Sequence, residues 1–142
     1  MRRAGLIALS AAGLALAACS PAATQESDAA TAETKTGSVE TLSADELSRL
    51  LEEGDIHLID VRSDDEVASG MIPGAEHIAL DEFDPAKLGI EDTSKIVLYC
   101  RSGRRSGVAA ERLAQFTGQD VRHLDGGIIA WQDSGRAVTQ AR

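Results

Sequence analysis

Residues 95–106 constrain the fold of this chain more than any other stretch. They read Lys-Ile-Val-Leu-Tyr-Cys-Arg-Ser-Gly-Arg-Arg-Ser, so an apolar run is followed at once by a loop with three arginines. A short apolar run bounded by polar residues indicates a buried strand, here residues 96–99. A helical pattern begins at Ser106. The stretch therefore predicts a strand, a loop over residues 100–105 and a helix, which is the repeating unit of parallel sheets.

Cys100 opens this loop, at the carboxyl end of the predicted strand and just before the predicted helix. The first N–H groups of a helix lack intrahelical partners, and the helix dipole adds positive charge at the same end. Both effects favour the thiolate, which is the nucleophilic form of cysteine. A lone cysteine is often only a small buried hydrophobe. That alternative fits poorly with three neighbouring arginines, which are difficult to bury.

The other residues of the loop are candidates for binding an anion next to Cys100. Glycine allows a tight turn in which backbone N–H groups surround the sulfur. The serine hydroxyls are further donors, although Ser106 serves equally well as a helix N-cap. The candidate anion-binding residues are Arg101, Ser102, Gly103, Arg104, Arg105 and Ser106.

The remainder of the chain alternates between strand and helix patterns. Ser43 with Glu46, and Ser63 with Glu66, have the spacing of capping boxes that open helices. Strands are predicted at residues 39–42, 56–61, 76–80, 96–99 and 121–124, and helical segments at 43–54, 63–70, 83–88, 106–118 and 128–133. This alternation predicts an α/β fold with a central, mostly parallel five-stranded sheet and helices on both faces.

Ligands of such sheets bind at the carboxyl ends of the strands, where Asp60 and Cys100 both lie. Asp60 is either the partner of a loop arginine, with Arg105 the best placed, or a turn former or helix cap at the strand end. Arg62 is expected to pair with a nearby carboxylate such as Glu66. The three histidines, His57, His77 and His123, lack metal-ligand spacing and no Cys-x-x-Cys occurs, so no metal site is expected.

The amino-terminal residues form a targeting signal. Two arginines precede an uninterrupted small and apolar run, residues 4–18, which is shorter than the about 20 residues of a bilayer span. The end of the run, Leu-Ala-Ala-Cys19, resembles the lipobox of bacterial lipoproteins. This resemblance implies cleavage before Cys19, lipidation of Cys19, and a location on the periplasmic face of the cell envelope. Ser20 favours the outer membrane. An ordinary secretory signal cleaved after Ala17 is the alternative.

The composition of residues 20–38 indicates a disordered linker, because they are rich in Ala, Ser and Thr and contain no large apolar residue. The predicted order is therefore a signal peptide (1–18), a lipidated cysteine with a disordered linker (19–38) and one domain (39–142). The net charge is −9, which argues against a nucleic-acid partner. A basic loop on an acidic domain indicates a small anionic ligand instead.

Four local motifs, in order, resemble the rhodanese family of sulfurtransferases. They are Ile-Asp60-Val-Arg62, Gly70-Met-Ile-Pro-Gly-Ala-Glu-His-Ile78, the loop from Cys100 to Arg105, and Leu124-Asp-Gly-Gly-Ile-Ile-Ala-Trp131. Met71 and Val67 depart from the family pattern at positions expected to serve packing. The resemblance implies a rhodanese domain that nearly fills residues 39–142, with Trp131 in its core.

The resemblance also implies a reaction. The Cys100 thiolate would take the sulfane sulfur of thiosulfate as a persulfide and pass it to a thiol or cyanide acceptor, without a cofactor and in a monomer. Two alternatives stay open. Phosphatases and arsenate reductases of the same fold have a Cys-x5-Arg loop, whereas this loop is Cys-x4-Arg. A sulfur carrier or binding module without turnover is the second alternative.

Overall fold

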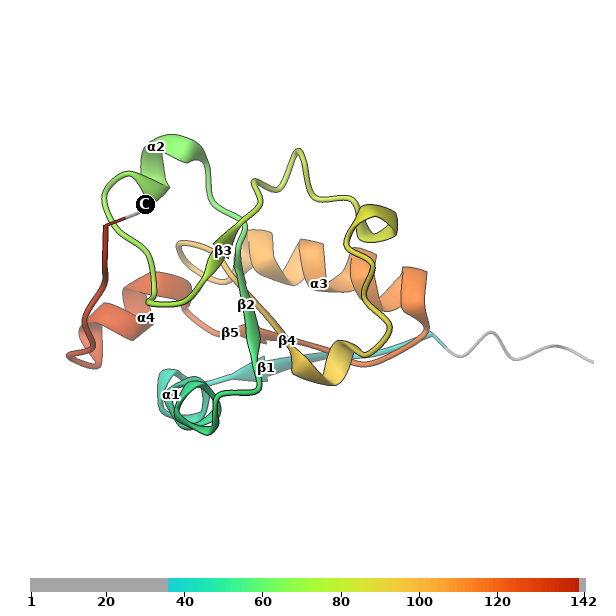
Figure 1. The fold of residues 1–142 in the computed structure, drawn as a ribbon, viewed down its shortest axis with the longest axis horizontal. Coiled ribbons are helices and arrows are strands. Elements are labelled where there is room, and N and C mark those ends of the chain that lie inside the picture. The colour runs from blue at the N-terminus through green and yellow to red at the C-terminus, as the bar shows by residue number, and fades with distance from the viewer. Residues whose placement is uncertain (1–35, 141–142) are drawn as a thin grey trace, which may run out of the picture. The chain divides into compact units, whose positions relative to one another are not determined.

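A central sheet of five parallel strands organises the computed structural model, which describes residues 36–140. The strands are β1 (Val39–Leu42), β2 (His57–Asp60), β3 (Glu76–His77), β4 (Ile96–Tyr99) and β5 (Val121–Leu124). Their order across the sheet is β1-β5-β4-β2-β3, so β4 lies at the centre and carries Cys100 just beyond its end (Figure 1). The predicted fold class is confirmed, and every strand pair is parallel.

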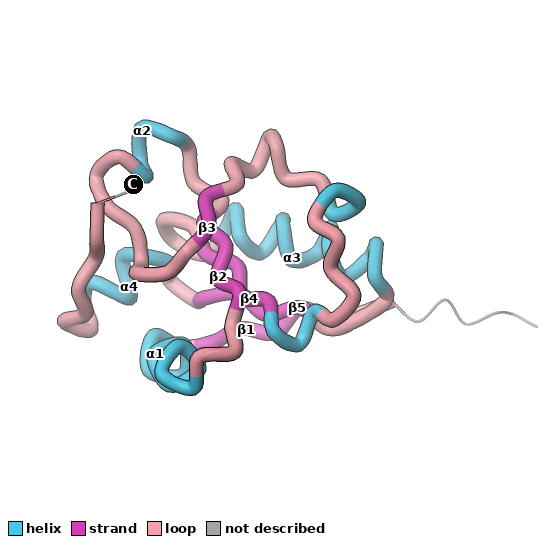
Figure 2. The backbone as a smooth tube through the Cα atoms, viewed as in Figure 1, coloured by secondary structure: helices cyan, strands magenta, loops and turns pink. Residues whose placement is uncertain are grey.

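Helices cover both faces of the sheet. On one face, α3 (Arg104–Thr117) buries its apolar side against residues such as Ile59, Leu98 and Val121. On the other face, α1 (Ala44–Glu53) and α4 (Gly127–Asp133) pack against Leu58 and Val97. The backbone tube shows α3 and α1 on opposite sides of the strands (Figure 2). The two apolar clusters therefore share one sheet, and the site residues lie at its carboxyl edge.

The predicted capping signals account for the helix boundaries. Ser43 accepts from the Glu46 N–H and the Glu46 carboxylate accepts from the Ser43 N–H, which completes the capping box of α1. Gly54 ends α1 with φ at +82°, a conformation that costs other L-residues about 1–2 kcal/mol. The second box, at Ser63 and Glu66, opens α2 (Asp64–Val67). Two 3₁₀ helices, η1 (Pro85–Lys87) and η2 (Thr93–Lys95), complete the elements.

Several predicted boundaries are wrong, including the helix expected at residues 63–70, which ends at Val67, and two others that bear on the site. The strand expected at residues 76–80 is shorter, with only Glu76 and His77 paired to β2. The last bond to β2 runs from the Ile78 N–H to the carbonyl of Asp60, the residue at which β2 ends. The helix expected from Ser106 begins at Arg104 instead, because Gly103 adopts φ at +89° and reverses the chain one turn earlier. Ser106 is therefore not the N-cap of α3.

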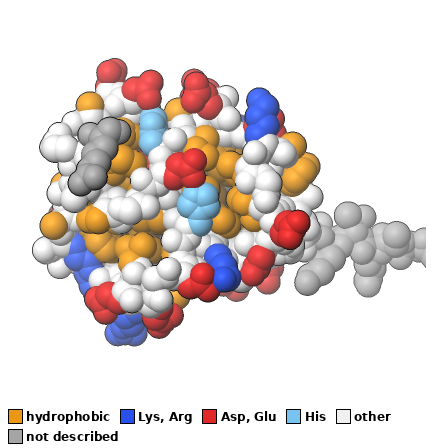
Figure 3. All heavy atoms as spheres, viewed as in Figure 1, with side chains coloured by type: hydrophobic (Ala, Val, Ile, Leu, Met, Phe, Trp, Pro, Cys, Tyr) orange, Lys and Arg blue, Asp and Glu red, His pale blue; other side chains and the backbone are white. Residues whose placement is uncertain are grey.

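The predicted signal peptide, Cys19 and most of the predicted linker lie outside the described residues. Within residues 36–140, no helix combines the length and the apolar character needed to cross a membrane. On the face drawn in Figure 3, acidic side chains are spread over the surface rather than gathered in one patch.

Candidate active site

The Cys100 side chain is buried, with only 1% of the residue exposed, at the start of the loop between β4 and α3. Burial raises the pKa of the Cys100 thiol, but hydrogen bonds from the backbone N–H groups of Ser106, Ser102 and Arg105 and from the Ser106 hydroxyl outweigh it, so the pKa is lowered overall. The Ser106 Oγ lies 3.7 Å from Sγ. The loop thus surrounds the sulfur with donors, and this arrangement stabilises a thiolate.

Arg105 is the loop arginine that interacts with the sulfur. Its guanidinium hydrogen-bonds the Glu66 carboxylate at 2.7 Å and interacts electrostatically with Cys100. The hydrogen bond from Arg105 lowers the pKa of Glu66 to about 2. Glu66, at the third position of α2, therefore holds Arg105 beside the sulfur.

Arg101 and Arg104 are exposed, and neither has a carboxylate partner among residues 36–140. Ser102 is also exposed and contributes its N–H to the sulfur. The loop therefore presents two unpaired positive charges to solvent, next to a buried sulfur. Such a surface attracts small anions.

Of the two alternatives for Asp60, the pairing with Arg105 is wrong and the turn former at the strand end is confirmed, because the Asp60 Oδ1 accepts from the Arg62 N–H at 3.0 Å. Asp60 and Arg62 form a buried ion pair, in which the Arg62 Nη2 lies 2.6 Å from the Asp60 Oδ2. Arg62 also donates to the carbonyls of Glu66 and Gly70, at 3.1 and 2.6 Å. The expectation that Arg62 pairs with a nearby carboxylate is confirmed, but that carboxylate belongs to Asp60, since the Glu66 carboxylate pairs with Arg105. Asp60 and Arg62 hold the segment after β2, so their role is structural.

The turn Asp125-Gly126-Gly127 brings α4 against the cysteine loop. The N–H groups of Ile128 and Ile129 donate to the carbonyls of Cys100 and Arg101, at 2.8 and 3.2 Å. A Cβ at Gly127 would lie 2.3 Å from the Cys100 carbonyl oxygen, and the residue has φ at +59°. Only glycine fits at this position, because any side chain would push the loop away from α4.

Sequence patterns alone did not identify Glu66 and His123 as members of this site. Glu66 belongs to a capping box, and this role was sufficient to explain a glutamate at that position in the sequence. His123, on β5, lies with its Nδ1 3.2 Å from the Ser106 Oγ. Its position could have identified it. His123 directly precedes the last residue of β5, and β5 lies next to β4, which leads to Cys100.

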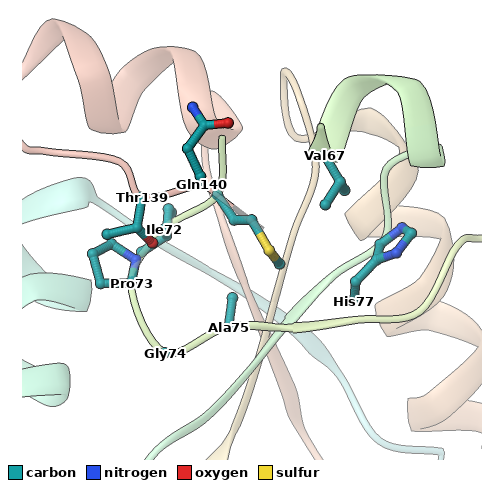
Figure 4. A pocket seen from close by; sticks show the side chains of 9 residues that line it. Val67, Ile72, Pro73, Gly74, Ala75, His77, Thr139 and Gln140 are labelled. Atoms are coloured by element: carbon teal, nitrogen blue, oxygen red, sulfur yellow. The ribbon is translucent and has the colours of Figure 1, made fainter. Parts of the chain in front are cut away.

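A cavity of about 290 Å³ flanks the cysteine loop. It is lined by Arg62, Glu66, Ser69, Gly70, Arg101, Ile128, Ile129 and Gln132. A larger cavity, of about 520 Å³, has no residue of the cysteine loop in its lining. Figure 4 shows this larger cavity, in which Val67 and His77 face Thr139 and Gln140 of the carboxyl-terminal segment. Its titratable group, His77, is already bonded to the Arg62 carbonyl at 2.7 Å. The candidate chemistry therefore lies at the cysteine loop, whose arginines line the smaller cavity and a further cavity of about 460 Å³.

Metal ligation has no candidate in residues 36–140, where no group of three or more His, Cys, Asp or Glu side chains is arranged to hold an ion. The fold and the site together define a parallel α/β domain with one cysteine in a loop of hydrogen-bond donors. The chain belongs to the family of rhodanese-like domains, whose profile matches residues 43–134. The resemblance found in the four sequence motifs is confirmed.

Individual relatives agree with this assignment. A sulfurtransferase of Allochromatium vinosum is 38% identical over 90 residues, which are 63% of this chain and 84% of the relative. The human thiosulfate:glutathione sulfurtransferase is 35% identical over 107 residues, covering 64% of this chain and 91% of the relative. A crystal structure of a rhodanese-like domain protein from Staphylococcus aureus superposes with a TM-score of 0.60 at 30% identity, covering 72% of this chain and 99% of that one.

Some relatives are longer than the region they share with this chain. An uncharacterized protein of Synechocystis is 32% identical over 102 residues, which are 72% of this chain but 57% of the relative. The shared region is thus little more than half of that protein.

Proposed function

We propose that this protein is a sulfurtransferase that moves sulfane sulfur from thiosulfate, or a related anionic donor, to a thiophilic acceptor through a persulfide on Cys100. The observation that carries the proposal is the environment of the sulfur. Three N–H groups, the Ser106 hydroxyl and the Arg105 guanidinium all interact with it. The names of the bacterial and human relatives support the same class of reaction.

The reaction has two steps. The Cys100 thiolate attacks the outer sulfur of thiosulfate, a new S–S bond forms, and the old S–S bond breaks with its electron pair leaving on sulfite. The charge of the persulfide anion falls among the donors that held the thiolate. The acceptor, a thiolate or cyanide, then attacks the outer sulfur of the persulfide and restores the Cys100 thiolate. This is covalent catalysis by an activated nucleophile.

The rate of thiocyanate formation from thiosulfate and cyanide tests the proposal. We expect turnover by the wild type, and an intact mass increased by one sulfur atom when cyanide is omitted. Cys100→Ser is expected to abolish both signals, because a serine hydroxyl is not ionised at neutral pH. Retained turnover in Cys100→Ser would refute the role of Cys100.

Assays of the same protein for other reactions distinguish sulfur transfer from the two alternatives. Hydrolysis of an aryl phosphate or reduction of arsenate without sulfur transfer would indicate the phosphatase or arsenate reductase alternative. A single added sulfur that no acceptor removes would indicate a carrier without turnover. The Cys-x4-Arg spacing favours sulfur transfer over the phosphatase or arsenate reductase alternative, and turnover is the measurement that separates an enzyme from a carrier.

We further propose that the protein is anchored in the cell envelope through a lipid on Cys19, facing the periplasm, with the outer membrane favoured by Ser20. The motivation is the apolar run that ends in Leu-Ala-Ala-Cys19. Cys19→Ser is expected to move the protein from the membrane fraction to the soluble periplasmic fraction. Persistence in the membrane fraction would refute the lipid anchor.

A further inference from the structure

His123 is a buried titratable residue that the proposed reaction does not use. It is 8% exposed and lies under α3, where a Cβ on Gly107 would be 3.6 Å from its Cε1. Its Nδ1 is 3.2 Å from the Ser106 Oγ, and that oxygen is 3.7 Å from the Cys100 Sγ. The three side chains thus form a chain of contacts that ends at the sulfur.

The Ser106 hydroxyl has one proton and three neighbours that can accept it. They are the Cys100 sulfur, the Gly103 carbonyl oxygen at 3.0 Å, and the His123 Nδ1 if that nitrogen is unprotonated. If Nδ1 carries a proton, it donates to the Ser106 oxygen and no longer competes for the hydroxyl proton. The ring tautomer of His123 therefore decides whether one of the two competitors of the thiolate is present, while the Gly103 carbonyl competes in either case.

The surroundings of His123 keep the ring neutral. Burial lowers the pKa of His123 more than the carboxylates of Asp125 and Glu111 raise it. Its neighbours in register, Thr41 on β1 and Leu98 on β4, carry no charge. No fully buried side-chain nitrogen or oxygen in residues 36–140 lacks a partner, so the Nε2 of His123, which bonds no described residue, contacts solvent.

We propose that His123 is a positioning residue, which donates its Nδ1–H to Ser106 Oγ. The imidazole then no longer competes for the Ser106 hydroxyl proton, and donation to the Cys100 sulfur is favoured. A hydrogen bond to a charged acceptor is among the stronger ones in proteins, so the arrangement stabilises the thiolate and the persulfide anion. The consequence for catalysis rests on the proposed sulfurtransferase function, whereas the stabilisation of the Cys100 thiolate is independent of that function.

The pH dependence of Cys100 alkylation tests this arrangement in the full chain with Cys19→Ser, where Cys100 is the only cysteine. His123→Leu removes the donor at similar volume, and we expect a profile displaced to higher pH, with about a tenfold lower rate near pH 6. His123→Asn places an N–H close to the position of Nδ1 and is expected to recover most of the rate. His57→Leu, on the exposed end of β2, is the matched histidine control and is expected to keep the wild-type profile.

A double-mutant cycle shows whether His123 acts through Ser106. Ser106→Ala is expected to slow alkylation as His123→Leu does, and the double variant is expected to be no slower than Ser106→Ala alone. A wild-type profile in His123→Leu, or additive effects in the double variant, would overturn the positioning role. Thermal unfolding of each variant shows whether it is folded.

Histidine side-chain ¹⁵N shifts of the wild type provide a test that needs no His123 variant to fold. We expect Nδ1 protonated and Nε2 unprotonated at neutral pH, and the opposite tautomer would overturn the proposal. A failure of the proposed sulfurtransferase function would give a different result from a failure of the positioning role. Thiosulfate would then add no sulfur to the wild type, while the alkylation profiles would still depend on His123 and Ser106.

Discussion

Among the single residues of the site, Arg105 combines two contacts that rarely coincide. Its guanidinium bonds a carboxylate, Glu66, and also interacts with the nucleophilic sulfur. The carboxylate fixes the guanidinium and raises the pKa of Arg105, so the arginine is charged and oriented before an anion arrives. Arg101 has no such partner in the described part of the chain and is free to follow an anion into the site.

We expect Arg105→Ala to lower kcat/KM for thiosulfate by about 10²- to 10³-fold, as for the loss of one preorganised donor to developing charge. Arg105→Lys is expected to recover only part of this loss, because an ammonium lacks the planar fork that bonds Glu66 and the sulfur together. Arg101→Ala is expected to cost less. Arg49→Ala, on the exposed side of α1, serves as the control. Equal rates for wild type and Arg105→Ala would show that this contact has no catalytic role.

The Glu66–Arg105 pair also predicts a pH dependence of stability. The pKa of Glu66 is lowered from its ordinary 4.5 to about 2, so the pair contributes stability that is present above 4.5 and is lost as the pH falls towards 2. Urea unfolding of wild type and Glu66→Gln should therefore differ by a constant free energy from about pH 5 to pH 8, and the difference should shrink below that range. A difference that persists unchanged near pH 3 would contradict the lowered pKa.

The same residues show how far the sequence could predict the site. Cys100 and the loop were identifiable because their residue types are unusual at a strand end. The partners were not, because which carboxylate meets which arginine depends on side-chain geometry across the loops. Asp60 is two residues from Arg62 and bonds it, and this leaves Glu66 for Arg105. His123 was missed because the Ser106 contact exists only once β5 and α3 are packed together.

At the scale of secondary-structure elements, strands and helices were predictable where a local signal sets them. The capping boxes and Gly54 fixed α1 and the start of α2. Boundaries that depend on a partner were not predictable. The end of β3 is set by where β2 stops, and the start of α3 is set by the reversal at Gly103.

Contact between α4 and the cysteine loop gives a prediction at this scale. Gly127→Ala combines a positive φ with a Cβ that would lie 2.3 Å from the Cys100 carbonyl oxygen. We expect a loss of about 2–5 kcal/mol in the free energy of unfolding. Gly54→Ala is the matched control, since its φ is +82° with no atom within 4 Å of the added Cβ, and it should cost about 1–2 kcal/mol. Equal losses in urea unfolding would contradict the close approach.

The whole domain carries one natural probe on each face of its sheet. Trp131, the only tryptophan, is in the cluster under α1 and α4, whereas Cys100 is in the cluster under α3. Both clusters are built on the same strands, so neither is expected to survive the loss of the other. We predict that Trp131 fluorescence, far-UV circular dichroism and the accessibility of Cys100 change at one urea concentration. Separate midpoints would show that the two faces unfold independently.

The bonds from α4 to the cysteine loop also decide which way the loop's peptide groups face. A trans peptide unit is planar, with its C=O and N–H pointing in opposite directions, and no peptide bond among the described residues is cis. The carbonyl of Arg101 and the N–H of Ser102 belong to one such unit. When Ile129 holds that carbonyl outward, at 3.2 Å, the N–H of Ser102 is turned inward to the sulfur. The backbone of α4 thereby sets the electrical polarity of the space into which an anion must fit.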